Sequence, residues 1–170
     1  MKIKILLLAA LISVTSGCAL TGPAYVKIQN IPTSKAVLYV YRPDIFQNKG
    51  IVPGVKIDRQ EYAAIPAGGY MPFLLDEGQH EIELILSDRY KDLPSLKLDV
   101  AKNTEYFVRI ETAFDMGGLV VLPKSFSFSY KRSFRPLLVD QAIGENEIVN
   151  NKLVDPLTGE RFSKSIFIED

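Results

Sequence analysis

Apolar residues in this chain recur mostly at every second position, which is the period of a β-strand. The first clear case is the segment 36–42, which Pro43 ends. Val37, Tyr39 and Tyr41 would share one face of this strand. The intervening positions are also apolar: Ala36, Leu38 and Val40. Because both faces are apolar, we expect a strand that is covered on both sides.

Further strands follow at regular spacing. Four segments alternate between apolar and polar positions: 79–86, 96–100, 105–111 and 125–131. Turn residues lie between them, at 66–69, 76–78 and 102–103, and Gly117-Gly118 indicates a turn or a bulge. In the segment 125–131 every second residue is aromatic and the others are mostly serine. This spacing predicts a mostly β fold, a single antiparallel β-sandwich over residues 36–153.

Proline marks the segments that we expect at the margins of the sandwich. A strand over 51–58 would contain Pro53, and a strand over 70–75 would contain Pro72. Each proline indicates an edge position or a bulge, because proline cannot donate a hydrogen bond to a sheet.

The end of the chain carries a different pattern. A short helix is predicted around residues 145–153, and a tail follows over 154–170. Within the tail, 165–168 is expected to form a last strand. A loose end that adds to the sheet of a partner is the alternative.

The first 17 residues have the layout of a secretory signal. Lys2 and Lys4 make a positive start, residues 5–14 are almost wholly apolar, and small residues precede Cys18. The apolar run is about half of the roughly 20 residues that span a bilayer, which argues against a membrane helix. We therefore expect residues 1–17 to be a signal peptide.

The residues around Cys18 resemble the lipobox of bacterial lipoproteins. Ser-Gly before the cysteine matches that pattern, whereas Thr15 stands where leucine is usual. The resemblance implies cleavage before Cys18, a diacylglycerol on its sulfur and an acylated amino terminus. Alanine directly after the cysteine, here Ala19, resembles the outer-membrane class of Gram-negative lipoproteins. The resemblance implies an anchor in the outer membrane that faces the periplasm. Two or three acyl chains anchor stably, and residues 18–35 are expected to form a tether.

Composition agrees with an exported domain. Cys18 is the only cysteine, and lipidation would account for an unpaired thiol in an exported chain. The chain balances 20 basic against 20 acidic residues, and losing Lys2 and Lys4 with the signal leaves 18 − 20 = −2. Without a basic excess, nucleic acid is not an expected partner. A hydrophobic content of 47% supports a real core.

Groups that could carry chemistry are few. His80 is the only histidine, and we expect it to fix a hairpin by bonding backbone groups instead of serving a catalytic triad. One histidine and a lipidated cysteine do not suit a zinc site. The carboxylate pairs Glu81/Glu83 and Glu145/Glu147 are expected to be exposed charges. The sequence thus predicts no catalytic residue, no cofactor and no metal.

The first strand offers two further hypotheses. Tyr39 and Tyr41 resemble an aromatic binding strip, but on a central strand we expect them in the core. Arg42 ends this strand, where an anion is one possible partner; we expect it to pair with an acidic neighbour instead.

Three motifs together resemble a family of small bacterial lipoproteins whose domain has no assigned function. They are the lipobox, the strand end Val40-Tyr41-Arg42-Pro43, and Gly78-Gln79-His80 after an acidic turn. A later strand, 105–109, is also similar, so the resemblance covers about residues 36–111. The hairpin is similar to that of PEGA-type modules of bacterial surface proteins. The resemblance implies an immunoglobulin- or PEGA-like sandwich in the cell envelope, and it implies no activity.

These observations favour a lipid-anchored envelope protein that acts as a binding or structural module. Its partners would be the membrane, through acyl chains on Cys18, and another envelope protein. Two alternatives remain at this point. One is an envelope hydrolase that uses carboxylates or His80, and the other is a carrier of a small apolar ligand.

Overall fold

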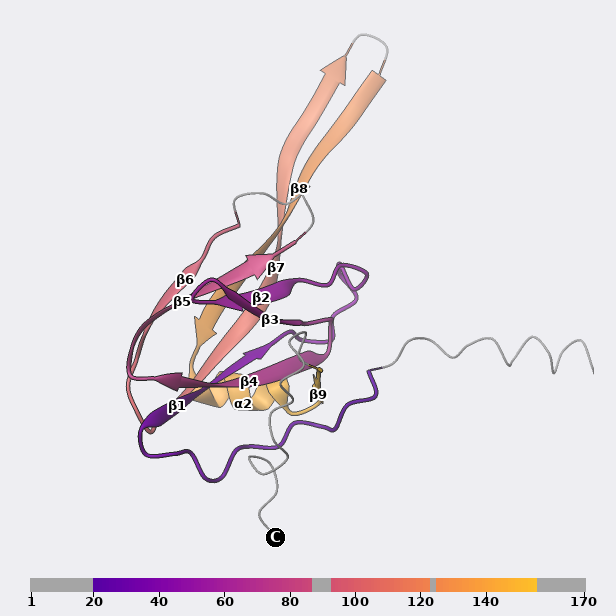
Figure 1. Cartoon of the computed structure of the whole chain (residues 1–170). Coiled ribbons are helices and arrows are strands. Elements are labelled where there is room, and N and C mark those ends of the chain that lie inside the picture. Colours follow the sequence, from indigo (N-terminus) through magenta and orange to yellow (C-terminus); the bar gives the residue numbers. More distant parts are fainter. Residues whose placement is uncertain (1–19, 87–92, 123–124, 156–170) are drawn as a thin grey trace, which may run out of the picture.

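Two β-sheets pack on each other, and a short helix lies against the larger sheet (Figure 1). The computed structural model describes residues 20–86, 93–122 and 125–155, with backbone alone over 113–122 and 125–132. The larger sheet has the order β8-β7-β1-β4-β9 and the smaller sheet the order β3-β2-β5-β6. The larger sheet contains β1 (Lys35–Tyr41), β4 (Gly69–Asp76), β7 (Glu105–Leu122), β8 (Ser125–Val139) and β9 (Lys152–Leu153). The smaller sheet contains β2 (Gly54–Ile57), β3 (Gln60–Ala64), β5 (Gly78–Ile85) and β6 (Leu96–Val100). The predicted mostly β sandwich is confirmed.

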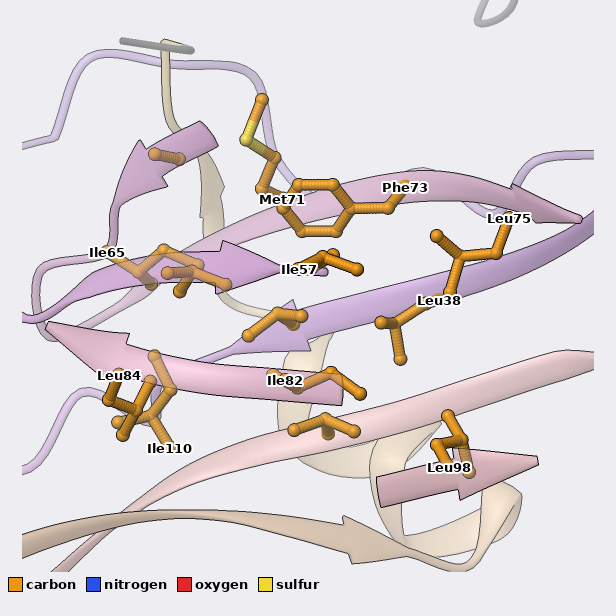
Figure 2. Packing of buried hydrophobic residues seen from close by; sticks show 14 of the residues in the cluster. Leu38, Ile57, Ile65, Met71, Phe73, Leu75, Ile82, Leu84, Leu98 and Ile110 are labelled. Carbon is orange, nitrogen blue, oxygen red and sulfur yellow. The ribbon is translucent and has the colours of Figure 1, made fainter. Parts of the chain in front are cut away.

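The main core lies between the two sheets (Figure 2). Leu38 of β1 is fully buried and belongs to the same cluster as Ile57 of β2 and Ile82 of β5. Fully burying one such aliphatic side chain contributes about 1.5–3 kcal/mol. The apolar residues that alternate with polar ones along β5 and β6 are therefore the side chains that face this core.

The larger sheet is also covered on its outer face, as the pattern of β1 predicts. Val37, Tyr39 and Tyr41 are each 0% exposed and form a second cluster. The helix α2 (Gln141–Ile148) covers part of this face, where its Gly144 lies directly against Phe107 of β7. Both apolar series of β1 are thus buried, one in each layer.

The N-terminal segment completes this second layer. The backbone N–H of Ile28 donates to the hydroxyl of Tyr39 at 2.9 Å, and Ile28 is only 4% exposed. The ring of Tyr25 meets the rings of Tyr39 and Tyr70 edge to face, with centroids 5.4 Å apart in both pairs. Within the range expected to form a tether, Leu20 thus packs against the main core, and Tyr25 and Ile28 pack on the outer face of the larger sheet.

Strand order differs from a purely antiparallel sandwich at two places. β1 pairs with β7 in parallel, and the two-residue β9 pairs in parallel with the start of β4. Pro72 does lie at an edge, since β9 pairs only with Gly69 and Tyr70 of β4. Pro53 does not, because β2 begins at Gly54 and lies between β3 and β5. The pairing of β2 with β3 instead contains an irregularity between Val55 and Lys56.

β7 and β8 continue past β1 as a long two-stranded ribbon, the β7–β8 arm (residues 110–136). Its base is buried in the main core at Ile110 and Phe134, and its outer part projects from the body in Figure 1. Strand β1 pairs with β7 only as far as Arg109, whereas β7 and β8 pair from Phe107–Val139 to Leu122–Ser125. The register shifts between Met116 and Leu119, so Gly117-Gly118 form the expected bulge instead of a turn.

Several sequence predictions concern parts outside the described residues. These are the signal peptide 1–17, Cys18, the expected strand 165–168 and the side chains of 125–131. The helix predicted around 145–153 does form, but it begins at Gln141 and ends at Ile148. It ends there because Asn151 bonds to the sheet and the next two residues form β9.

Candidate functional site

The described chain begins and ends at the same end of the domain, where its first and last residues contact each other. Leu20 packs against the main core, and the N–H of Leu153 donates to the carbonyl of Pro23 at 2.8 Å. A Cβ on Gly22 would lie 1.9 Å from the carbonyl oxygen of Leu153, so this approach requires glycine. Cys18, the predicted lipid attachment site, stands two positions before Leu20 in the sequence.

Arg42 lies at the same end of the domain as a fully buried cation. Its Nη1 donates to the carbonyl of Ile51 at 2.5 Å, and its Nη2 donates to the carbonyl of Asn48 at 2.7 Å. Its Cζ is 5.4 Å from the ring centroid of Phe134, which is a cation–π distance. Burial lowers the pKa of Arg42 from its usual value.

These contacts correct the expectation for Arg42. No carboxylate within the described ranges forms an ion pair with it, and the two carbonyl oxygens take that role. The side chain is 0% exposed, so it has no surface on which to bind a soluble anion. The function of Arg42 visible here is to organise the segment between β1 and β2.

That segment, the β1–β2 loop (residues 43–53), is held by its own hydrogen bonds and presents apolar side chains. The N–H of Ile51 donates to the carbonyl of Asn48 at 3.0 Å, and Lys49 forms an ion pair with Asp44 at 2.7 Å. Phe46 at the tip is 92% exposed. Sequence reasoning missed this feature, although an isolated phenylalanine in a polar, turn-rich segment was a signal for it.

Asn151 joins the end of β1 and the start of β4 to the helix and the N-terminal segment. Its Nδ2 donates to the carbonyls of Arg42 and Gly69, at 2.9 Å each, and the residue is 2% exposed. Its own carbonyl accepts the N–H of Tyr25 at 3.0 Å, and its N–H donates to Ile148 at 2.8 Å. The side chain of Asn151 thus satisfies two buried carbonyls, while its backbone bonds the N-terminal segment and the end of the helix. Such a role has no sequence signature.

His80 bonds a backbone group beside its hairpin, as expected, and also a carboxylate. Its Nε2 lies 3.0 Å from the carbonyl of Asp76, and its Nδ1 lies 2.6 Å from the Oδ2 of Asp58. Both partners are acceptors, so the doubly protonated ring satisfies both contacts. Partial burial opposes the charge, but the hydrogen bonds to Asp58 and Asp76 outweigh it and raise the pKa of His80.

Asp58 explains why the histidine is held there. Asp58 and Arg59 form the two-residue turn between β2 and β3, with φ angles of 50° and 71°. Such positive angles at both positions suit a hairpin turn but strain residues other than glycine. The carboxylate of Asp58 also accepts the N–H of Glu81 at 2.9 Å, so the turn is fastened to β5. The arrangement is a structural brace.

The carboxylate pairs considered from the sequence are divided among structural contacts. On the helix, Glu147 accepts from the Tyr41 hydroxyl at 2.6 Å and from Arg109 at 2.7 Å. Burial, together with the hydrogen bond to Glu147, raises the pKa of Tyr41, which keeps the phenol a donor. Glu145 bonds instead to Lys27 at 2.7 Å, fastening the N-terminal segment to α2.

On the smaller sheet, Glu81 accepts from the hydroxyl of Ser95 at 2.6 Å. Glu83 stands opposite Lys56 in the pairing of β5 with β2.

Two open clefts lie on the described surface. One, of about 500 Å³, is at the start of β7 and of α2, beside Glu105, Arg109 and Ile143. The other, of about 470 Å³, lies between the entering chain and residues Pro66 and Val154. The described ranges contain no group of three or more His, Cys, Asp or Glu placed to hold a metal ion. They also contain no helix with the length and hydropathy needed to span a bilayer.

Comparison with known proteins adds no assignment. No protein-family model matches the chain, and the search of curated proteins finds no match.

Proposed function

We propose that the protein is a lipid-anchored lipoprotein of the bacterial envelope whose β-domain is a binding or structural module without catalytic activity. Its anchor is a set of acyl chains on Cys18, in the outer membrane and facing the periplasm. Its partner is another envelope protein. The observation that carries the proposal is the β7–β8 arm, two paired strands that leave the sandwich and have no described strand along their outer edges.

The edges of the arm are its binding feature. β1 pairs with one side of β7 from Glu105 to Arg109. From Ile110 to Leu122, the same side of β7 has no described partner strand. β8 ends the row of described strands in the larger sheet, so its outer side is also an edge within that part of the chain. A two-stranded ribbon is marginally stable alone, and an added strand from a partner would satisfy its free backbone groups. Strand addition of this kind is a common mode of protein recognition.

The base of the arm is fixed to the body by charged side chains. Arg109 donates to Glu111 at 3.2 Å and to Glu147 of α2 at 2.7 Å. Arg135 of β8 pairs with the same Glu111. This ladder ties both strands of the arm to the helix. The arm therefore leaves the body in a defined direction, which lowers the entropy lost on binding.

Anchoring at the membrane would allow a weak contact between the arm and a partner strand to be effective. A domain held at a membrane meets other proteins of that membrane at a high effective concentration, so modest affinity suffices. Each buried CH₂ of an acyl chain contributes about 0.8 kcal/mol, and two or three chains hold the protein stably. The module would thus act by proximity.

Photo-crosslinking in living cells tests this proposal. A photoreactive phenylalanine analogue would replace Ser127, on the arm, in the full-length protein. The matched control places it at Lys97, an exposed position of β6. We expect one discrete protein adduct from position 127 and none from position 97. Equal capture at both positions, or capture of abundant neighbours alone, would refute the arm as the binding element.

A Cys18→Ala variant tests the anchor separately. We expect it to leave the membrane fraction and to lose the adduct at position 127. Wild-type localisation of this variant would refute lipid tethering, whatever the arm does.

A further inference from the structure

The β1–β2 loop carries an exposed apolar tip that the main fold does not use. Phe46 is 92% exposed, and Ile45 and Val52 of the same loop are 41% and 45% exposed. Exposed apolar residues are ordinary when scattered singly, whereas several on one short loop indicate a contact surface.

The tip is presented by an ordered loop. Arg42 holds the carbonyls of Asn48 and Ile51 from inside, as described above. The ion pair between Lys49 and Asp44 leaves the loop with balanced exposed charges. The apolar side chains therefore do not collapse onto the core, and their exposure is set by the fold.

The loop lies at the end of the domain where the chain enters. The backbone of Arg42 exchanges hydrogen bonds with Gly68 and Gly69, at 2.9 Å and 3.0 Å. Gly68 in turn accepts the N–H of Lys152 at 2.8 Å, and the next residue, Leu153, bonds to Pro23. Figure 1 shows the same arrangement, with the purple loop and the entering indigo chain on the right of the body.

Geometry then limits how far this end can lie from an anchor on Cys18. Leu20 is packed against the core, and Cys18 precedes it by two residues. Two extended residues span at most about 7 Å, at roughly 3.3–3.6 Å each. Acyl chains on Cys18 would therefore hold this end of the domain at the headgroup layer, with no slack for it to swing away.

We propose that the β1–β2 loop is a second membrane contact, which inserts Phe46 and Ile45 into the interface of the bilayer that holds the acyl chains. The inference rests on the proposed anchoring at Cys18. An aromatic ring and a branched aliphatic chain suit the boundary between headgroups and acyl chains. Two contacts fix orientation where one does not, so the domain would stand on the membrane in a defined pose. The β7–β8 arm, which leaves the body in another direction, would then be presented at a set angle.

Tryptophan fluorescence tests the contact, because the chain contains 0 Trp. Phe46→Trp introduces a unique indole at the tip. Ile143→Trp is the matched control, since Ile143 is apolar, 46% exposed and near the start of α2. Helix α2 begins at Gln141, whose side chain donates to Glu105. Glu105 pairs with Val37 near the start of β1, whereas the β1–β2 loop follows the end of β1. The control therefore lies at the opposite end of the domain.

Both full-length variants would be expressed in a Gram-negative host and extracted from its membranes. They would then be placed in vesicles of phosphatidylethanolamine and phosphatidylglycerol. We expect lipids brominated on their acyl chains to remove roughly half of the emission of the Phe46→Trp variant, as for a side chain at the headgroup and acyl boundary. Aqueous iodide should spare that indole. The Ile143→Trp variant should show the opposite pattern, and circular dichroism should be the same for both.

Three results would overturn the inference, and they differ from one another. If the two indoles respond alike while the protein stays on the vesicles with its acylated mass, the loop contact is wrong and the anchor stands. If the protein carries no acyl mass and does not float with vesicles, the anchor fails and the loop contact with it. If the Phe46→Trp indole is shielded in whole envelope membranes but not in protein-free vesicles, the loop binds a protein and not lipid.

Discussion

Replacing the buried Arg42 should reveal what holds the β1–β2 loop. We compare Arg42→Lys, which keeps the positive charge, with Arg42→Met, which keeps the apolar stem and removes the charge. We expect the lysine variant to be the less stable of the two, although lysine is the chemically closer residue. The reason is the fork geometry of the guanidinium, which serves two carbonyl oxygens at once.

The magnitude follows from these contacts. A hydrogen bond to a charged group contributes about 1.5–3 kcal/mol, and a desolvated cation–π contact contributes about 2 kcal/mol. Lysine would keep one of the two hydrogen bonds and move its charge away from the ring of Phe134. It would still bury an ammonium group, which costs several kcal/mol. Losing one hydrogen bond and the cation–π contact should therefore cost about 3.5–5 kcal/mol in Arg42→Lys.

Methionine leaves two carbonyls without their donor, at about 1–3 kcal/mol each. It also removes the penalty of burying an ion, which offsets part of that loss. We expect a net loss of about 1–3 kcal/mol for Arg42→Met, measured as the free energy of unfolding in urea by circular dichroism. Chymotryptic cleavage after Phe46 should accelerate in both variants, because the loop loses its internal support.

An exposed arginine provides the control. Arg135, whose side chain is 53% exposed, forms a surface ion pair with Glu111. Arg135→Met should therefore change stability by less than about 1 kcal/mol. If Arg42→Met proves less stable than Arg42→Lys, the charge itself and not the fork geometry holds the loop, and the reasoning above is refuted.

Three further predictions concern other parts of the fold. The folded protein raises the pKa of His80 above that of the free side chain, which is about 6.5. The charged ring therefore stabilises the fold fully below about pH 6.5, and this stabilisation is lost as pH rises through the raised pKa. In urea, wild type should therefore lose its advantage over His80→Gln with increasing pH, and a constant difference would contradict this. Gly144→Ala gains about 1 kcal/mol of helix propensity, but its Cβ would lie 2.3 Å from Phe107 Cγ. Overpacking costs about 1–3 kcal/mol, so we expect a lower urea midpoint, whereas Gly50→Ala, with open space around it, should not lower it. Asn151→Ala removes two buried hydrogen bonds and should cost about 2 kcal/mol; an unchanged thermal midpoint would contradict the bracing role.

The sandwich could be predicted because strand periodicity is a local property of the sequence. The two apolar series of β1 predicted burial on both faces, and the alternation of β5 and β6 predicted their core-facing sides. The parallel pairing of β1 with β7 could not be predicted, because it depends on which distant strand fills the space beside β1. β9 has only two residues and hence no period to recognise.

The misjudged residues are those whose role depends on long-range partners. A charged residue at a strand end is usually exposed or paired with an acid, yet Arg42 is enclosed by the loop that follows it. Tyr25 and Ile28 follow a Gly-Pro pair and precede a proline, a composition typical of linkers, but the outer face of β1 provides a site for both. The helix boundaries moved because Asn151 finds its partners in Arg42 and Gly69, far away in sequence.

The bridge between Ala24 and Lys152 has a kinetic consequence. It joins residues near the two ends of the described chain, so closing it requires almost the whole polypeptide to be ordered as one loop. Contacts of such sequence separation are entropically expensive to form first, and topologies rich in them fold slowly. A partly synthesised chain lacks β9 and cannot close this end. The domain is thus expected to reach its native state only after β9 has been synthesised.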